Sequence, residues 1–324
     1  MTQLKTTFAG LSLRNPIIIS SSSLTNSAEK NKKRELAGAG AIVLKSVFEE
    51  QIMMEAHHMA TYGSPEGDDY LSTYVRSHAL NEYISLIEQT KKLCTIPVIA
   101  SINCFSNSEW TDFARTVETA GADALEINIL SLQTEKEYQC GSFEQRHIDI
   151  VSSIKKQISI PVIVKLGSNL TNPIALINQL YANGANAVVL FNRFYQPDIN
   201  IDTMTYSAGD VFSTPADLSN GLRWTAIASA QVPQTDYAIS GGVHDGKAIV
   251  KAILAGASAV ELCSVIYQRG NQVIADMTNE ITQWMNRQGY KNISEFKSSM
   301  NALSTGASNP FERTQFMKYF SSKE

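Results

Sequence analysis

The chain has 324 residues, of which 44% are hydrophobic and 18% charged, and its formal net charge is −4. This composition supports a sizeable buried core and argues against long disordered regions, while the scattered Lys and Arg residues argue against a nucleic-acid partner. The sequence shows neither an apolar leader nor the roughly 18 uninterrupted apolar residues of a membrane span, so we expect a soluble, cytoplasmic protein.

The cysteines Cys94, Cys104, Cys140 and Cys263 are far apart and show no C-x-x-C spacing. They therefore predict neither a zinc site nor a disulfide framework. The histidines form no cluster of metal ligands with them. We expect reduced thiols and no bound metal.

An internal repeat marks the predicted strands. The pattern Gly-Ala-x-Ala-apolar occurs at Gly38, Gly121, Gly184 and Gly256. Each glycine follows a segment of helical period and precedes a short apolar run, which is typical of a helix end that leads into a buried parallel strand. Strand starts of a second kind alternate with these copies, and Pro is their first strand residue in most cases. They lie at residues 15–18, 96–99, 160–163 and 236–239. Together the two kinds predict eight strands.

The segments between these strands suit helices, some with start signals such as Thr171 and Pro173 ahead of residues 174–182. Strand and helix alternating in this way predict an α/β protein, a single (β/α)8 TIM barrel that spans residues 1–324 as one domain. Residues 4–13 are expected to form an N-terminal hairpin that plugs the barrel floor. Long βα loops are expected after strands two, four and six, including residues 47–76 and 193–217.

The working residues of such a barrel lie where its strands end. The predicted strand ends carry Ser20, Ser21, Lys45, Ser46, Asn103, Asn128, Lys165, Asn192, Gly241, Gly242, Cys263 and Ser264. The lysines supply positive charge beside a ligand, and the asparagines offer paired donors and acceptors for a planar heterocycle. The residues after strands seven and eight predict a phosphate site formed by backbone N–H groups at helix N-termini.

Motifs along nearly the whole chain carry a resemblance to a known family. They are Gly10-Leu11-x-Leu13-x-Asn15-Pro16, Ala100-Ser101-Ile102-x-Cys104, Glu126-Ile127-Asn128 and Met285-Asn286-x-x-Gly289-Tyr290. With them the chain resembles the dihydroorotate dehydrogenase family, and its middle is also similar to the FMN domain of dihydropyrimidine dehydrogenase. The resemblance implies a barrel that binds FMN and acts on a small pyrimidine-like substrate.

The resemblance also implies which residues hold the flavin ring. Ser20 and Ser21 would lie against the flavin, and Lys45 and Ser46 would contact its ring and ribityl side. Lys165 would face the pyrimidine edge of the isoalloxazine, where positive charge stabilises the anionic reduced flavin.

The phosphate and the substrate are assigned by the same resemblance. The residues implied around the FMN phosphate are Ser219, Asn220, Gly241, Gly242, Cys263 and Ser264. Asn128 and Asn192 match asparagines that hold the substrate ring, with Asn128 also at the flavin. Lys45 is expected to reach the substrate and to take part in catalysis.

The catalytic loop departs from the family pattern. The family continues after the equivalent of Asn128 with Leu-Ser-Cys-Pro-Asn, or with Ser in place of Cys, whereas this chain has Leu130-Ser131-Leu132-Gln133. Ser131 falls on the position of the catalytic base, although a loop serine that faces solvent fits the sequence as well. Cys140 is an alternative base, and Arg76 is an alternative partner for a substrate carboxylate. We interpret Glu126 and Glu261 as barrel-interior carboxylates that pair with lysines.

The sequence thus favours an FMN-dependent oxidoreductase of the dihydroorotate dehydrogenase type, in pyrimidine biosynthesis. Hydride would move from substrate C6 to flavin N5, a proton from C5 to Ser131, and a soluble acceptor such as fumarate would reoxidise the flavin. A homodimer is expected by the resemblance. The alternatives are a diverged FMN oxidoreductase that acts on another pyrimidine or an activated alkene, and a flavin-binding barrel without turnover.

Overall fold

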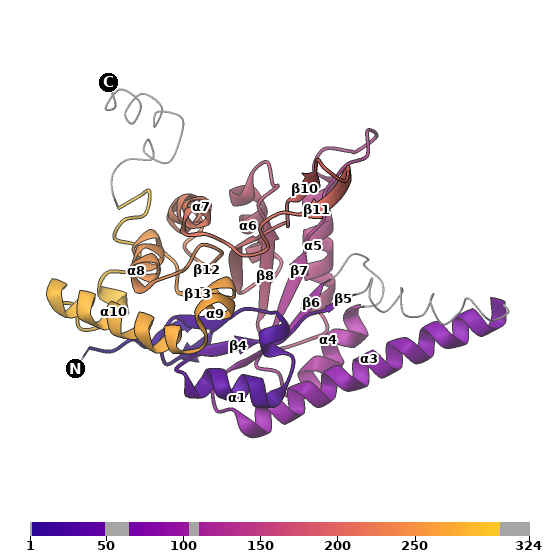
Figure 1. Ribbon diagram of the computed structural model, residues 1–324, viewed down its shortest axis with the longest axis horizontal. Helices are drawn as coiled ribbons and strands as arrows, with labels where there is room; N and C mark the ends of the chain where they lie inside the picture. Colours follow the sequence, from indigo (N-terminus) through magenta and orange to yellow (C-terminus); the bar gives the residue numbers. More distant parts are fainter. Residues whose placement is uncertain (1, 49–64, 104–109, 305–324) are drawn as a thin grey trace.

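The computed structural model describes residues 2–48, 65–103 and 110–304, and its centre is a closed parallel β-barrel surrounded by helices (Figure 1). Hydrogen-bonded neighbours follow one another around the barrel in the order β4 (Ala41–Val43), β3 (Ile17–Ile19), β13 (Ala259–Leu262), β12 (Asp236–Ser240), β9 (Ala187–Asn192), β8 (Val162–Gly167), β7 (Ala124–Ile129) and β6 (Val98–Asn103). The pairing of β6 with β4 closes the ring. The predicted strands and the TIM-barrel fold are therefore confirmed.

The second strand of the barrel, β4, is interrupted where the candidate site begins. After Leu44, whose N–H still bonds to the Ile99 carbonyl of β6, residues 45–46 leave the ladder, and the short β5 (Val47–Phe48) pairs with the end of β6. This break turns the segment that carries Lys45 and Ser46 out of the regular sheet, so that its side chains need not follow the strand alternation.

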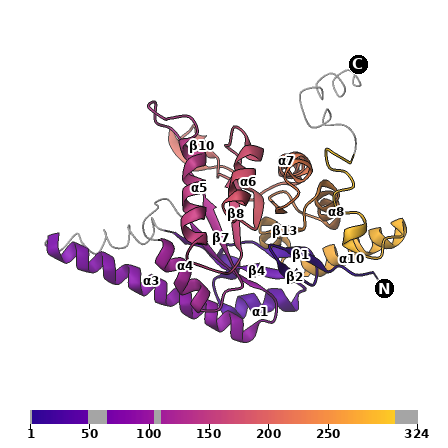
Figure 2. The same ribbon diagram turned by 180° about the vertical axis from the view of Figure 1, so that it is seen from behind.

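Helices cover the outside of the barrel, and α3 extends past it on one side (Figures 1 and 2). The α-helices are α1 (Ala28–Leu36), α3 (Pro65–Leu93), α4 (Trp110–Thr119), α5 (Ser142–Lys155), α6 (Pro173–Ala182), α7 (Leu218–Gln231), α8 (Gly246–Ala255), α9 (Ser264–Arg269) and α10 (Gln272–Gln288). Short 3-10 turns are η1 (Ser23–Thr25), η2 (Pro215–Asp217) and η3 (Ile293–Glu295). Within the described residues, none of these helices has the length and apolar character needed to cross a membrane.

The repeated glycines end helices as predicted. Gly38, Gly121, Gly184 and Gly256 all have positive φ, between 93° and 119°. At Gly256 the backbone N–H caps α8 by bonding to Ala252 and Ile253 carbonyls, a left-handed turn that a residue with a Cβ would adopt only under strain. The turn aims the chain directly into β13.

The N-terminal hairpin closes the barrel floor (Figure 2). Strands β1 (Thr6–Phe8) and β2 (Leu11–Leu13) pair antiparallel, and Phe8 and Leu13 join a fully buried cluster with inward-facing residues such as Ile18, Ile99 and Ile163. The Ala9 N–H donates to the Asp236 carboxylate at 3.0 Å, which fixes the hairpin to the first residue of β12. The predicted plug is confirmed.

The expected long loops follow the second, fourth and sixth barrel strands, which are β4, β7 and β9, but two of these loops contain regular structure. Helix α3 already begins at Pro65, so the connection after strand two is shorter than the predicted 47–76, because Pro suits the first turn of a helix. Residues 49–64 lie outside the described part. After strand six, β10 (Pro197–Asn200) and β11 (Thr205–Ala208) form an exposed hairpin. Residues 130–141, after strand four, form no helix or strand.

Candidate active site

A cavity of about 460 Å³ lies at the carboxyl ends of the barrel strands. Its walls include most of the strand-end residues singled out in the sequence: Ser20, Ser21, Ser46, Asn103, Asn128, Lys165, Asn192, Gly241, Gly242, Cys263 and Ser264. The barrel therefore brings together residues that are more than 200 positions apart in sequence. This is the face on which barrel enzymes carry their active sites.

Strand alternation places the charged residues inside the barrel. Side chains two apart on a strand point to the same face, so Glu126 follows the inward-facing Ala124 on β7, and Lys165 follows the inward-facing Ile163 on β8. Glu261 stands above Ala259 on β13 in the same way. A polar layer therefore lies directly above the apolar floor.

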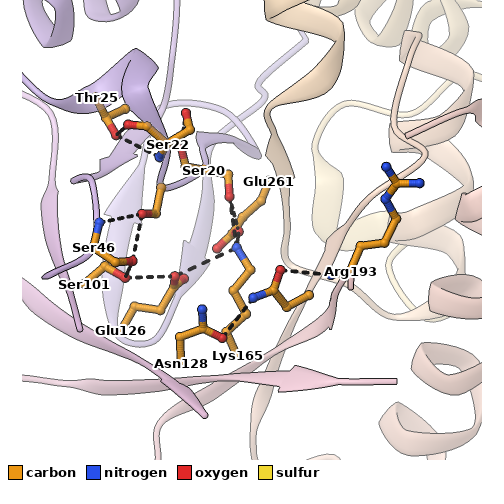
Figure 3. A network of polar contacts seen from close by, with 12 residues as sticks. Ser20, Ser22, Thr25, Ser46, Ser101, Glu126, Asn128, Lys165, Arg193 and Glu261 are labelled. Atoms are coloured by element: carbon orange, nitrogen blue, oxygen red, sulfur yellow. Dashed lines mark hydrogen bonds and ion pairs between the residues drawn. The ribbon is translucent and has the colours of Figure 1, made fainter. Parts of the chain in front are cut away.

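Lys165 is the centre of this layer (Figure 3). Its Nζ lies 2.5 Å from Glu261 Oε2, 3.9 Å from Glu126 Oε1, and 2.9 Å from Ser20 Oγ, to which it donates. The Ser20 hydroxyl in turn donates to Glu261 Oε2 at 2.9 Å. All four side chains are buried, which confirms that the two glutamates pair with a lysine inside the barrel.

The three charged groups shift one another's pKa. Burial, and then the neighbouring Glu261 carboxylate, raise the pKa of Glu126 well above its usual value. Burial also disfavours the charged form of Glu261, but the Lys165 ammonium and hydrogen bonds outweigh it and lower the pKa of that carboxyl. The two carboxylates likewise outweigh burial at Lys165 and raise its pKa. The layer therefore favours a charged Lys165–Glu261 pair and disfavours a second negative charge on Glu126.

A chain of hydroxyl groups connects Glu126 to the segments that follow the barrel strands β3 and β4. Ser101 Oγ donates to Glu126 Oε1 at 3.4 Å and lies 2.7 Å from Ser46 Oγ. Ser46 Oγ lies 2.9 Å from Ser21 Oγ, which also accepts from the Ser46 N–H at 2.8 Å. The Tyr83 hydroxyl of α3 accepts from the Ser101 N–H and donates to its carbonyl. These bonds hold Ser21 and Ser46 at the cavity wall.

Two asparagines lie side by side at the ends of the barrel strands β7 and β9. The Asn192 Nδ2 donates to Asn128 Oδ1 at 3.0 Å, and the Asn192 Oδ1 accepts from the Arg193 N–H at 2.8 Å. Asn128 is paired in register with Lys165 across β7 and β8. The amide pair can therefore bind one edge of a planar ring held beside Lys165.

Glycines form the opposite end of the cavity. Gly241 and Gly242 have φ of 87° and 74°. A Cβ on Gly242 would lie 2.1 Å from the Leu218 nitrogen at the start of α7, whereas a Cβ on Gly241 would meet nothing within 4 Å. Backbone N–H groups at a helix start beside an open glycine suit an anion such as a phosphate. Ser219 and Asn220 are exposed in the first turn of α7 and do not line the described cavity.

Two predicted catalytic residues lie apart from the described cavity walls. Lys45 lines a neighbouring cavity of about 520 Å³ between the strand-two break and α3. Ser131 is half-buried: its Oγ accepts from Gln133 Nε2 at 3.2 Å, and its carbonyl accepts from Asn169 Nδ2 at 3.0 Å. Cys140 is exposed at a separate depression before α5. The side chain of Arg76 lies outside the described part.

Arg193 is a cavity residue that the sequence did not single out. It lines the cavity, and its Nη2 donates to the Asp210 and Val211 carbonyls at 2.7 and 2.6 Å, which ties the connection after strand six to the mouth. The signal in the sequence that could have identified Arg193 is its position directly after Asn192, at a strand end. Phe48, Phe194 and Tyr195 add aromatic walls. The described residues contain no cluster that could hold a metal ion.

Comparison with known proteins gives the same family along most of the chain. Residues 3–285 match the family model described as dihydroorotate dehydrogenase. The chain belongs to the dihydroorotate dehydrogenase family. This membership confirms the resemblance noted in the sequence and the oxidoreductase class that it implies.

Individual relatives cover nearly the whole chain. The catalytic subunit of dihydroorotate dehydrogenase B (NAD(+)) from Thermoplasma volcanium is 27% identical over 305 residues, 91% of this chain and 97% of that protein. The protein of the same name from Methanocella arvoryzae is 29% identical over 87% of this chain and 93% of its own length. Dihydroorotate dehydrogenase A (fumarate) from Limosilactobacillus reuteri is 28% identical, over 78% and 84%.

Removing the lysine of the polar layer should destabilise the protein. We expect Lys165→Met to lower the free energy of unfolding by about 3–5 kcal/mol at neutral pH, because it leaves Glu261 charged, buried and unpaired. The loss should shrink as the pH falls, since a proton then neutralises the carboxylate charge that Lys165 no longer balances. Urea denaturation at several pH values measures it.

The control is Lys91→Met, which removes a partly exposed ion pair with Asp123. Its expected cost is about 0–1 kcal/mol. Equal costs for the two variants would contradict a buried, charged Lys165–Glu261 pair.

Proposed function

We propose that this protein is an FMN-dependent dehydrogenase that oxidises dihydroorotate to orotate. The observation that carries the proposal is the contact between Asn128 and Asn192 beside Lys165, inside the strand-end cavity of a dihydroorotate dehydrogenase family barrel. An amide pair that offers both donors and acceptors matches the alternating N–H and C=O groups of a pyrimidine ring.

The cavity residues fit a flavin mononucleotide. Gly241 leaves open space at the end where α7 begins, so backbone N–H groups there can approach a phosphate closely. Ser20, Ser21 and Ser46 line the cavity on the side of the polar layer. Lys165 places a positive charge where a reduced flavin carries negative charge. The aromatic walls supply apolar contact for a ring system.

The chain's own residues then orient the reaction. FMN, when bound, supplies the hydride acceptor. Asn128 and Asn192 hold the substrate ring, and Ser131, next to the cavity-lining Leu130, accepts the proton from C5. We propose that a soluble acceptor reoxidises the enzyme, in line with relatives named for NAD(+) and for fumarate.

The visible spectrum tests this function. The purified protein should show flavin absorbance, anaerobic dihydroorotate should bleach it, and fumarate or NAD(+) should restore it. Asn192→Leu should keep the flavin spectrum but slow bleaching by dihydroorotate at least tenfold, because the variant loses ring contacts. A colourless protein that FMN does not reconstitute would reject the proposal.

The diverged loop after β7 favours one alternative, a family member that oxidises or reduces another pyrimidine or an activated alkene. The loop lacks the Pro and the second Asn of the family, and Ser131 does not line the described cavity. Background-level bleaching by dihydroorotate, together with rapid flavin reduction by such a compound, would select this alternative.

The assignment of Ser131 as base has its own test. We expect Ser131→Ala to slow anaerobic flavin reduction by about 10²–10⁴-fold, the usual contribution of a positioned base. Cys140→Ala is the matched control, since Cys140 lies on the same loop and is exposed. Rapid-mixing absorbance measures both rates. A slow Cys140→Ala enzyme beside a normal Ser131→Ala enzyme would transfer the role to Cys140.

We also propose that the enzyme acts in the cytoplasm as a homodimer. Exposed apolar side chains gather on the β10–β11 hairpin, including Ile199, Ile201, Met204 and Tyr206, and such patches mark interaction surfaces. Light scattering should give a mass near twice that of one chain. Ile201→Asp should shift it toward the monomer, whereas Leu36→Asp, at an equally exposed position on α1, should not. A monomeric wild type would contradict the dimer.

A further inference from the structure

The polar layer holds two carboxyl groups for one ammonium group (Figure 3). If both glutamates were ionised, this buried layer would carry one uncompensated negative charge, which is costly away from water. Among the described residues, Arg193 lines the same cavity, but its guanidinium donates to the Asp210 and Val211 carbonyls at the mouth. Burial raises the pKa of Tyr83 and of Cys263, so both stay neutral. The charge has to be balanced by a proton on the carboxyl pair itself.

The hydrogen-bond partners of the two carboxyls agree with one proton on the pair. Glu126 Oε1 and Glu261 Oε2 face Lys165 and the serines, whereas Glu126 Oε2 and Glu261 Oε1 are buried without a partner in the described part of the chain. The two carboxyls are nevertheless close enough that each shifts the pKa of the other. Two ionised carboxylates only accept, so the two carboxyls can form a hydrogen bond with each other only if one of them carries a proton.

We propose that Glu126 and Glu261 share one proton, and that this proton keeps the layer electrically neutral beside the pyrimidine edge of the flavin. With the proton in place, the carboxyl pair has one negative charge, which Lys165 balances. Two carboxyls close together titrate in separate steps for the same reason in other buried pairs. The role at the flavin rests on the function proposed above, whereas the shared proton does not.

The shared proton links flavin reduction to pH. Hydride transfer from the substrate brings two electrons and one proton to the flavin and leaves one negative charge on it, while the carboxyl pair retains its own proton. Above the pKa of the pair that proton is lost, and the layer gains a negative charge that disfavours the reduced flavin. The reduction potential should therefore fall more steeply with pH than in a protein without the pair.

Infrared spectroscopy of the apoprotein tests the shared proton without any cofactor. Wild type at neutral pH should show the C=O stretch of a protonated carboxylic acid, and ¹³C-glutamate labelling should shift it. Both Glu126→Gln and Glu261→Gln should abolish this band, because each leaves a single carboxylate paired with Lys165. Glu35→Gln is the control: Glu35 is also buried, but hydrogen bonds and the charge of Lys32 outweigh burial and lower its pKa to about 2, so the band should remain.

Two results would overturn the shared proton. One is the absence of the band in wild type, a measurement that depends on no variant. The other is its survival in Glu261→Gln, which would assign the proton to Glu126 alone, held there by burial.

The FMN-loaded protein tests the role at the flavin through its reduction potential. Both Gln variants should flatten the pH dependence of the potential in the same way, although they change different strands. Identical slopes in wild type and variants would refute the charge-balancing role. A protein that binds no FMN would instead defeat the proposed function, and the infrared result would still decide the shared proton.

Discussion

The ion pair between Lys165 and Glu261, with Glu126 beside it, is the constraint on which the site depends. Each buried ion costs several kcal/mol in lost hydration, and this cost is recovered only if the partner groups are held at short distances. The strands β7, β8 and β13 provide that rigidity, because their backbone ladders fix where the three side chains meet. Ser20 and Ser101 complete the hydrogen bonds.

Two layers of inward-facing side chains in the barrel serve different purposes: the lower layer stabilises the fold, and the layer above it forms part of the candidate site. Its floor is an apolar cluster that the N-terminal hairpin completes with Phe8 and Leu13. One strand repeat higher, the inward positions become charged. The apolar layer below excludes water from the charged layer and lowers the local dielectric, which strengthens the interactions of Lys165 with its neighbours and with a flavin placed above.

The mouth of the barrel combines a preserved framework with a changed loop. The glycines after β12 lie beside the start of α7 at the end of the mouth proposed for a phosphate, and Asn128 and Asn192 form a hydrogen-bonded pair at the end proposed for the substrate ring. These features depend on strand ends, which the barrel fixes. The segment after Ile129 lies on no strand or helix, so substitutions there alter the mouth without disturbing the fold.

The sequence alone determined the eight strands, the helix-ending glycines and most of the cavity residues, because these follow from local periodicity and from the rule that barrel sites lie at strand ends. It also carried the family resemblance. Only the tertiary structure decided that Glu126, Lys165 and Glu261 meet, since their contact depends on the register of three strands. It likewise placed Lys45 in a neighbouring cavity and Arg193 at the mouth. The break after β4 and the fold of the strand-six connection set those positions, and neither has a periodic signal in the sequence.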